Sequence, residues 1–372
     1  MEKVSLVLKN NDSKCDVFSG RDLYDEIVTY ARGMKKSQNV IVTDSKVEEL
    51  HGKRLLELLQ KKGLNSFMIS FPEGEKNKNR ETKAKIEDEM FAHKCGRDAL
   101  IIALGGGVTG DMAGFVAGTY MRGIPIIQVP TTTIAIADSS MGGKTAIDVP
   151  AGKNLIGVFH QPRAVFMDTE LLKTLDARNY NSGLVEMIKH GMIKDIKFYD
   201  FVKENIDIIL DYKDEKYDVV MEKIVMDNLM IKKDVVVEDQ KESNLRKILN
   251  YGHTIGHAVE KLSNFDLFHG EAIAIGIAVE AFFAFKAGIM PQEDYLEQKQ
   301  ILERIGLDTK IPKEITTEKI IELTCLDKKA RGGEPEFTLC SKNGQYATFE
   351  NGNVTVKFSK EELTNWINEY RR

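Results

Sequence analysis

The segment Leu100-Ile-Ile-Ala-Leu-Gly-Gly-Gly-Val-Thr-Gly-Asp111 joins a short apolar run to a glycine-rich turn. Such a run predicts a buried β-strand, and the glycines after it predict a tight turn that opens a helix. Similar runs at residues 40–43, 67–70 and 126–129 alternate with helical patterns such as residues 47–62. Apolar strands that alternate with helices indicate a parallel sheet covered on both faces. The first part of the chain is therefore predicted to be an α/β domain.

Past about residue 175 the pattern changes from alternating strands and helices to helices. Few β-type runs occur there, and helical patterns occupy residues 182–212, 217–238, 250–262, 270–288 and 292–305. The sequence therefore predicts two domains, an α/β domain over residues 1–175 and an all-helical domain over residues 176–372.

The composition argues against two classes of partner. The chain has 372 residues, enough for two domains with buried cores. A net charge of −5 gives no basic surface for nucleic acid. The most apolar segment, residues 272–285, is interrupted by Glu280 and is too short to span a bilayer. We expect this segment to be a buried helix, and we expect neither nucleic acid nor a membrane as a partner.

Cysteine usage and the start of the chain favour the cytosol. Cys15, Cys95, Cys325 and Cys340 are widely spaced and form no C-x-x-C motif, as is typical of reduced, packed thiols. The first residues lack the apolar stretch of a signal peptide. We therefore expect a cytoplasmic protein.

Gly105, Gly106 and Gly107 lie between the predicted strand and the predicted helix. Glycines let backbone N–H groups approach a phosphate, and a helix N-terminus favours its negative charge. Thr131 and Thr132 follow the next predicted strand and add hydroxyl groups at the carboxyl edge of the sheet, where open α/β sheets bind ligands. The turn is not the usual G-x-G-x-x-G motif, but together these residues favour a nucleotide site.

Two lysines follow in glycine-rich segments, Lys144 in Met-Gly-Gly-Lys-Thr and Lys153 in Ala-Gly-Lys-Asn. Lysines held by such turns suit a phosphate or a carboxylate as point charges. Gly-Gly-Lys-Thr matches the end of a P-loop, but Asp138 stands where that motif requires its first glycine. The pattern therefore predicts an anionic ligand and argues against a Walker-type NTPase.

Three of the seven histidines, His253, His257 and His269, are close together in the sequence. Neutral imidazoles bind zinc-like cations, and a catalytic site usually takes three protein ligands and keeps one position open. Glu186 supplies a candidate third ligand. An i,i+4 spacing would pair His253 with His257, but Thr254 stands where a zincin motif needs its glutamate. The spacing leaves open which two histidines hold the metal.

Taken together, these segments resemble 3-dehydroquinate synthase, a family of the sugar phosphate cyclase group. The matching segments are residues 105–111, 119–123, 129–133, 138–145, 152–157, 186–189, 246–253 and 269–272. The resemblance implies a Rossmann-like NAD-binding domain, a helical metal- and substrate-binding domain, and an active site in the cleft between them. It also implies a homodimer.

The resemblance implies a specific reaction as well. The family's substrate is the anionic sugar phosphate 3-deoxy-D-arabino-heptulosonate 7-phosphate, and its product is 3-dehydroquinate. NAD serves as a catalytic cofactor that accepts a hydride and takes it back. Zn²⁺ or Co²⁺ acts as a Lewis acid on a substrate hydroxyl and carbonyl.

Roles for individual residues also follow from the resemblance. The metal ligands are Glu186, His253 and His269, while His257 turns towards the substrate. The other substrate-binding and catalytic positions are Asp138, Lys144, Lys153, Asn154, Lys189, Lys232, Arg246, Asn250 and Lys328. The cofactor positions are Asp44, Glu75, Lys78, Gly107, Asp111, Thr131 and Thr132, to which we add Gly105, Gly106, Lys144 and Lys153.

The chain departs from the family pattern at a few positions. Gln240 replaces a carboxylate before Arg246, Asp148 replaces an asparagine, and His190 stands where tyrosine is common. Cys340-Ser341 replaces a Leu-Pro segment, which weakens the placement of Lys328. These changes remove no predicted metal ligand.

Three alternative functions compete with this reading. Another sugar phosphate cyclase is disfavoured because this chain retains both Arg246 and Asn250 before His253, positions that vary in those relatives. A metal-dependent polyol dehydrogenase of the glycerol dehydrogenase kind would not need the anion-binding lysines, such as Lys144 and Lys189, that this chain has. A non-catalytic binding protein would be expected to lack a metal ligand or a lysine, and none is missing.

Overall fold

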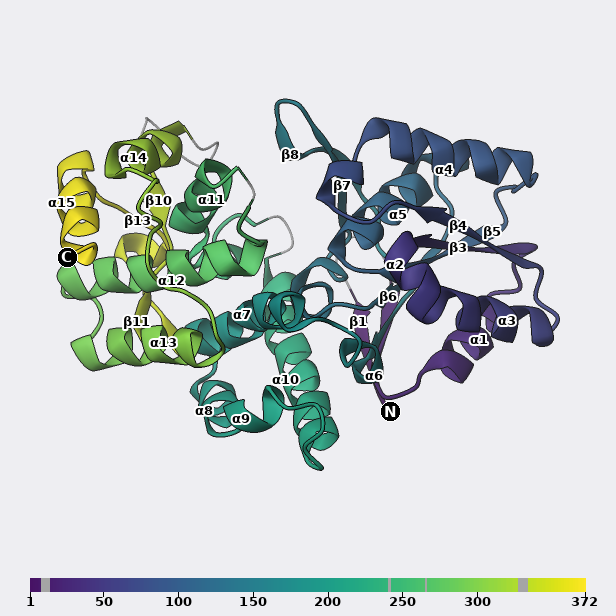
Figure 1. The fold of residues 1–372 in the computed structure, drawn as a ribbon, viewed down its shortest axis with the longest axis horizontal. Helices are drawn as coiled ribbons and strands as arrows, with labels where there is room; N and C mark the ends of the chain where they lie inside the picture. The colour runs from purple at the N-terminus through teal and green to yellow at the C-terminus, as the bar shows by residue number, and fades with distance from the viewer. Residues whose placement is uncertain (8–13, 240–241, 265, 327–333) are drawn as a thin grey trace. The chain divides into compact units, whose positions relative to one another are not determined.

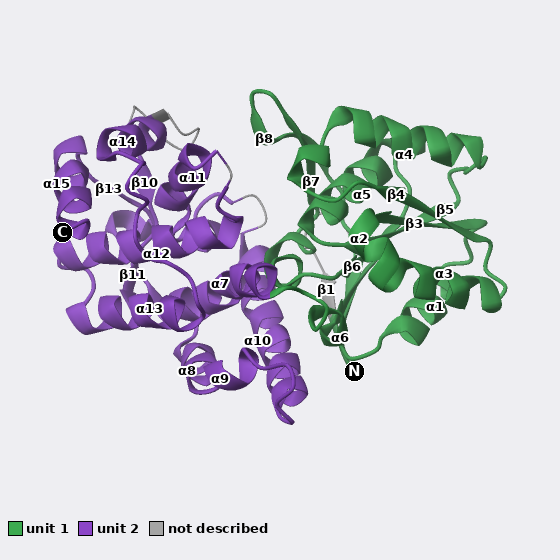
Figure 2. Ribbon diagram, viewed as in Figure 1, with its two compact units in different colours: residues 1–176 green, residues 177–372 purple. Residues whose placement is uncertain are grey.

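The computed structural model describes residues 1–7, 14–239, 242–264, 266–326 and 334–372 (Figure 1). The chain divides into two compact units, Met1–Asp176 and Ala177–Arg372 (Figure 2). This boundary lies one residue past the division expected from the sequence. The predicted fold class, an α/β unit followed by a largely helical one, is confirmed.

Unit 1 is built on a seven-stranded sheet with the order β1-β2-β9-β6-β5-β3-β4. Its strands are β1 (Glu2–Val7), β2 (Lys14–Gly20), β3 (Gln38–Asp44), β4 (Ser66–Phe71), β5 (Ala99–Gly105), β6 (Ile126–Pro130) and β9 (Ala164–Asp168). All neighbouring pairs are parallel except β1 and β2, which are antiparallel. The prediction of a parallel sheet is therefore correct, with one antiparallel edge strand added.

Helices cover both faces of this sheet, because alternate residues of each strand point to opposite sides. Ile101 packs with α4 (Arg80–Ala92) and α5 (Gly107–Thr119) on one face. Ile102 packs with α1 (Tyr24–Gly33) and α3 (Lys53–Lys61) on the other face. Two separate cores therefore hold the strand ends, and the turns that follow them, in fixed positions.

Shorter elements complete unit 1. They are α2 (Ser45–Val47), the π-helix η1 (Glu48–Gly52), the 3-10 helices η2 (Glu75–Asn77) and η3 (Tyr120–Arg122), the π-helix η4 (Ala135–Ser139), and α6 (Thr169–Leu172). An antiparallel hairpin of β7 (Lys144–Val149) and β8 (Gly152–Phe159) packs on α5. Lys144 is the first residue of β7 and Lys153 the second residue of β8, and each directly follows a glycine with a positive φ.

Unit 2 is largely helical. Its helices are α7 (Ala177–Lys194), α8 (Ile196–Glu204), α9 (Ile206–Ile209), α10 (Tyr217–Glu238), η5 (Leu245–Asn250), α11 (His253–Leu262), α12 (His269–Lys286), α13 (Gln292–Arg304), α14 (Thr317–Leu326), η6 (Glu350–Gly352) and α15 (Lys360–Tyr370). The apolar helix α12 is central and packs against α7, α11, α13 and α15. Its burial confirms the buried helix predicted from the apolar run. Within the described residues, no helix is long and apolar enough to cross a membrane.

Two details of unit 2 differ from the prediction. The segment 182–212 is not one helix, because the side chain of Asp195 caps the start of α8 by accepting hydrogen bonds from two backbone amides. The unit is also not all-helical. Two small sheets pair β10 (Glu336–Phe337) with β13 (Val356–Lys357), and β11 (Cys340–Lys342) with β12 (Gln345–Tyr346). Strands of two or three residues are too short to show a period in the sequence.

Candidate metal centre and active site

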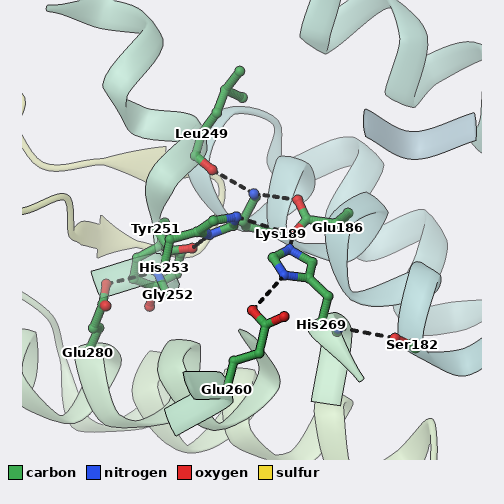
Figure 3. A network of polar contacts seen from close by, with 11 residues as sticks. Ser182, Glu186, Lys189, Leu249, Tyr251, Gly252, His253, Glu260, His269 and Glu280 are labelled. Carbon is green, nitrogen blue, oxygen red and sulfur yellow. Dashed lines mark hydrogen bonds and ion pairs between the residues drawn. The ribbon is translucent and has the colours of Figure 1, made fainter. Parts of the chain in front are cut away.

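Three helices of unit 2 bring four candidate ligands together, of which Glu186, His253 and His269 are drawn in Figure 3. Glu186 lies on α7, His253 and His257 lie on α11, and His269 is the first residue of α12. The distances from Glu186 Oε1 to His253 Nε2 and His269 Nε2 are 3.6 Å and 3.7 Å. Ring nitrogen atoms of the three histidines lie within 4.8 Å of one another.

The carboxylate of Glu186 favours one choice of ligands. Glu186 is buried, and its Oε2 accepts a hydrogen bond from Lys189 Nζ. Its Oε1 has no hydrogen-bond partner among the described residues. A buried oxygen without a donor is costly, and a cation between this oxygen and two imidazole nitrogens would remove that cost. One carboxylate and two imidazoles form a donor set that suits Zn²⁺ or Co²⁺.

The histidines differ in exposure. His253 is buried and only 9% exposed, His269 is half-buried, and His257 is exposed. A histidine that shares a metal with Glu186 must lie close to the buried Glu186 Oε1. A histidine that contacts a substrate must be accessible from solvent. This order of exposure favours His253 and His269 as ligands and His257 as a substrate-facing residue.

Neighbouring groups orient both candidate ligands. His269 Nδ1 lies 3.3 Å from Glu260 Oε2, and His253 Nδ1 lies 3.1 Å from the backbone oxygen of Tyr251. Hydrogen bonds at Nδ1 fix the ring and leave Nε2 for a metal, as is usual at metal sites. Sequence reasoning did not identify Glu260 as a partner of His269.

The charges around the cluster shift its pKa values. Burial would raise the pKa of Glu186, but Lys189, His253 and His269 outweigh it and hold that pKa well below its usual range. Burial and Lys189 lower the pKa of His253. Burial would also lower the pKa of His269, but the carboxylates of Glu186 and Glu260 outweigh it and raise that pKa to about 9. Glu186 is therefore ionised and His253 is neutral, as metal binding requires, whereas His269 must release a proton when it binds a metal.

Lys189 connects Glu186 of the metal cluster to the backbone of η5, the helix that carries Arg246 and Asn250. It is 1% exposed, and its Nζ donates a hydrogen bond of 2.6 Å to the backbone oxygen of Leu249.

Lys232 on α10 and Arg246 on η5 are also buried. Asn250 Nδ2 donates to Glu242 Oε1 at 2.8 Å. Lys328 and Gln240 lie outside the described residues.

Asp239 is a structural residue that the sequence analysis did not single out. Its carboxylate accepts hydrogen bonds from the backbone amides of Ser243, Asn244 and Arg246 at 2.7–3.1 Å. Burial would raise the pKa of Asp239, but these amides lower it to about 2. The ionised carboxylate therefore fixes the backbone of Arg246.

Unit 1 gathers a second group of predicted residues around Lys78. The side chain is 4% exposed, and its Nζ donates 2.6 Å hydrogen bonds to Asp111 Oδ2 and Asn154 Oδ1. Glu75 Oε1 lies 3.9 Å from the same atom. Burial would lower the pKa of Lys78, but Asp111 and Glu75 outweigh it and raise that pKa. Lys78 is therefore a buried cation that joins predicted cofactor and substrate residues.

Asp148, one of the departures from the family pattern, supports this group. Its Oδ1 accepts a 2.8 Å hydrogen bond from the backbone amide of Asn154, and its own amide donates to the backbone oxygen of Lys78. Asn154 has a φ of +55°, a conformation that asparagine tolerates better than most residues. Asp148 thus holds the hairpin turn that presents Lys153 and Asn154.

The predicted nucleotide residues lie at the carboxyl ends of neighbouring strands. Asp44 ends β3, caps α2, and accepts a 3.2 Å hydrogen bond from Thr109 Oγ1. Gly105 ends β5, and its backbone oxygen accepts a hydrogen bond from the amide of Thr131 after β6. A Cβ atom at Gly105 would lie 2.6 Å from Thr109 Cβ, so the turn requires glycine there.

The remaining predicted residues flank this turn. A Cβ atom at Gly106 would lie 3.1 Å from Thr132 Cγ2, and one at Gly107 would lie 3.2 Å from Ser139 Oγ. Asp138 is in η4, which begins shortly after Thr132. The structure therefore brings the glycine turn, Thr132 and Asp138 into one region of unit 1, at the N-terminus of α5.

Residues 68–182 match the family model described as 3-dehydroquinate synthase N-terminal, and residues 183–330 match that described as 3-dehydroquinate synthase C-terminal. The 3-dehydroquinate synthase of Pelobacter propionicus is 42% identical over 303 residues, which cover 81% of this chain and 83% of the relative. That of Desulforamulus reducens is 39% identical over 336 residues, with coverages of 90% and 92%.

A solved structure also resembles this chain along its length. It is 2-deoxy-scyllo-inosose synthase complexed with carbaglucose-6-phosphate, NAD⁺ and Co²⁺. The TM-score is 0.89 at 27% sequence identity, and the match covers 99% of both chains.

Proposed function

We propose a role for each residue group described above on one premise: the chain belongs to the 3-dehydroquinate synthase family. The chain is accordingly a carbon–oxygen lyase that converts 3-deoxy-D-arabino-heptulosonate 7-phosphate to 3-dehydroquinate and phosphate, a step of the shikimate pathway. The observation that carries the residue assignments is the unpartnered Glu186 Oε1 beside His253 and His269.

Glu186, His253 and His269 would hold Zn²⁺ or Co²⁺. The bound cation supplies Lewis acidity to a hydroxyl and a carbonyl oxygen of the substrate. Glu260 orients His269 through Nδ1, and Lys189 keeps the carboxylate of Glu186 ionised. His257 remains exposed and is proposed to exchange a proton with the substrate.

NAD would be held by unit 1. Asp44, at the carboxyl end of β3, would accept hydrogen bonds from ribose hydroxyls, and Gly105, Gly106 and Gly107 would let the backbone approach the pyrophosphate. The other proposed cofactor residues are Glu75, Lys78, Asp111, Thr131, Thr132, Lys144 and Lys153. Bound NAD accepts a hydride from the substrate and returns it.

The phosphate and carboxylate of the substrate require cationic and amide donors. We assign this role to Lys144, Lys153, Asn154, Lys189, Lys232, Arg246 and Asn250, with Asp138 and Lys328 as further substrate residues. Asp148 and Lys78 support this assignment in unit 1, because they hold Asn154 in place. In unit 2 the same support comes from Asp239, which fixes the backbone of Arg246.

Phosphate release tests the proposed function directly. The protein, incubated with the heptulosonate phosphate, Zn²⁺ or Co²⁺, and NAD well below the substrate concentration, should release phosphate over many turnovers per NAD. The reason is that NAD is regenerated in each cycle. Phosphate is measured by a colorimetric assay and NADH by absorbance.

Two outcomes of this assay would contradict the proposal. Accumulation of NADH in step with product would indicate a net oxidoreductase such as a polyol dehydrogenase. Phosphate release from glucose 6-phosphate, with none from the heptulosonate phosphate, would indicate a different sugar phosphate cyclase.

A homodimer in the cytoplasm is also part of the proposal. The four cysteines, all unpaired, support the location. The hairpin supports the dimer, because strand β8 lies at the edge of a two-stranded sheet and carries Leu155 and Phe159, which are 40% and 76% exposed. An exposed edge strand with apolar side chains favours association.

Light scattering after size-exclusion chromatography should give twice the chain mass of 41.9 kDa. Phe159→Ser should shift the protein towards the monomer, whereas Phe91→Ser, at a 53% exposed position on α4, should not. A parent protein that elutes as a monomer would refute the dimer.

A further inference from the structure

Glu280 is a buried acidic residue in the middle of the apolar helix α12. Its exposure is 0%, and its sequence neighbours Val279 and Ala281 are buried apolar residues. Burying a carboxylate is costly unless hydrogen bonds compensate it. The metal and substrate assignments above give Glu280 no role, so its presence in the core requires another explanation.

The carboxylate of Glu280 holds the beginning of α11. Glu280 Oε2 accepts a 2.8 Å hydrogen bond from the backbone amide of Gly252 (Figure 3), and Oε1 accepts a 2.9 Å bond from the amide of Ile255. Amides in the first turn of a helix lack partners within the helix, and a negative charge there is favourable. The N-cap residue Gly252 has no side chain that could cap α11. Glu280 therefore caps α11 from a neighbouring helix.

Glycines make this reach possible by letting α11 and α12 approach each other. A Cβ atom at Gly276 would lie 1.9 Å from the backbone oxygen of Gly252. A Cβ atom at Gly256 would lie 2.7 Å from Ile273 Cδ1. The two helices are thus in backbone contact one turn before Glu280, which follows Gly276 by four residues on the same helix face.

The helices joined in this way carry the three histidines of the metal cluster. The capped first turn of α11 begins with His253, and His257 follows one turn later, while α12 begins with His269. Any rotation or shift of α11 along α12 would change the distance from His253 Nε2 to the other ligands. The two hydrogen bonds to Glu280 oppose both movements.

We infer that Glu280 is a positioning residue that sets α11 against α12 and so preorganises His253 for the metal. This inference rests on the proposed metal site. Glu280→Gln keeps the side-chain shape but leaves one acceptor oxygen, and its NH₂ group would face a backbone amide. Metal affinity should fall by about 10-fold to 100-fold, the range for groups that orient metal ligands.

The test is a titration of the metal-free protein with Co²⁺, followed by visible absorbance, which reports the coordination geometry. Glu280→Gln should bind Co²⁺ more weakly and give an altered spectrum, whereas its affinity for NAD should equal that of the parent protein. The matched control is Phe283→Leu on the same helix, whose ring packs 5.7 Å from those of Phe337 and Trp366. This variant should unfold at a lower temperature yet keep the affinity and the spectrum of the parent.

The inference about Glu280 would be overturned if Glu280→Gln bound Co²⁺ like the parent, or if Glu280→Gln and Phe283→Leu lost the same Co²⁺ affinity. Either result would leave the proposed metal site standing. Failure of the parent to bind Co²⁺ would overturn the metal site as well. If Glu280→Gln does not fold, hydrogen exchange in the parent protein tests the inference instead. The amides of Gly252 and Ile255 should then exchange slowly, and exchange at the rate of uncapped first-turn amides would overturn the inference.

Discussion

Removal of the metal with a chelator should abolish phosphate release, and added Zn²⁺ or Co²⁺ should restore it. The reason is that the metal supplies the Lewis acidity of the reaction. The described side chains around Glu186 cannot supply it in place of the metal. The measurement is phosphate release by the chelated and the reconstituted protein, with metal content determined in parallel. Full activity in a metal-free sample would refute the metal site.

Two alanine variants distinguish the candidate ligand sets within this prediction. His269→Ala should weaken metal binding by more than about 100-fold, because loss of a ligand exceeds the effect of losing a group that orients one. His257→Ala should keep its metal and lose turnover by about 10²-fold to 10⁴-fold, the range for a proton-transfer group. Equal loss of metal in both variants would instead favour His253, His257 and His269, whose nitrogen atoms also lie within 4.8 Å of one another.

Lys153→Ala should lower kcat/KM far more than it lowers stability. Lys153 is half-buried on β8, beside Asn154, and Asp148 fixes the turn that presents both. Loss of a hydrogen bond to a charged group costs about 1.5–3 kcal/mol, or roughly 10-fold to 150-fold in kcat/KM. Steady-state kinetics and thermal unfolding should be measured together, with Lys85→Ala on the exposed face of α4 as the control. Normal turnover by Lys153→Ala would mean that this lysine is only a surface charge.

The regular elements could be predicted because their period is visible in the sequence. The apolar runs of β3, β4, β5 and β6 and the helix α10 are long enough to show it. The hairpin of β7 and β8 was missed because its glycines and lysines are typical of loops, whereas its pairing depends on packing against α5. Pairing between distant segments is a tertiary effect that a local window does not contain.

The residues of the candidate site also fall into two groups, those that the sequence could identify and those that it could not. The side chains of Glu186, His253 and His269 have a chemistry that points to a metal, and the structure brings them together. Asp239 and Glu280 act on backbone amides, which every residue except proline has. No residue type marks such a partner in the sequence, so these two carboxylates could be recognised only once the fold was known.

The backbone contact between α11 and α12 also limits how this enzyme can be engineered. Replacing a helical glycine by alanine is a standard route to a more heat-resistant variant, worth about 1 kcal/mol at an open position. Gly33, at the end of α1, is such a position, since a Cβ atom there would meet nothing within 4 Å. The same change at Gly276 would place a methyl group 1.9 Å from a backbone oxygen and push apart the helices that carry the histidines. At this residue, which touches neither metal nor substrate, the substitution should therefore lower both thermostability and metal affinity.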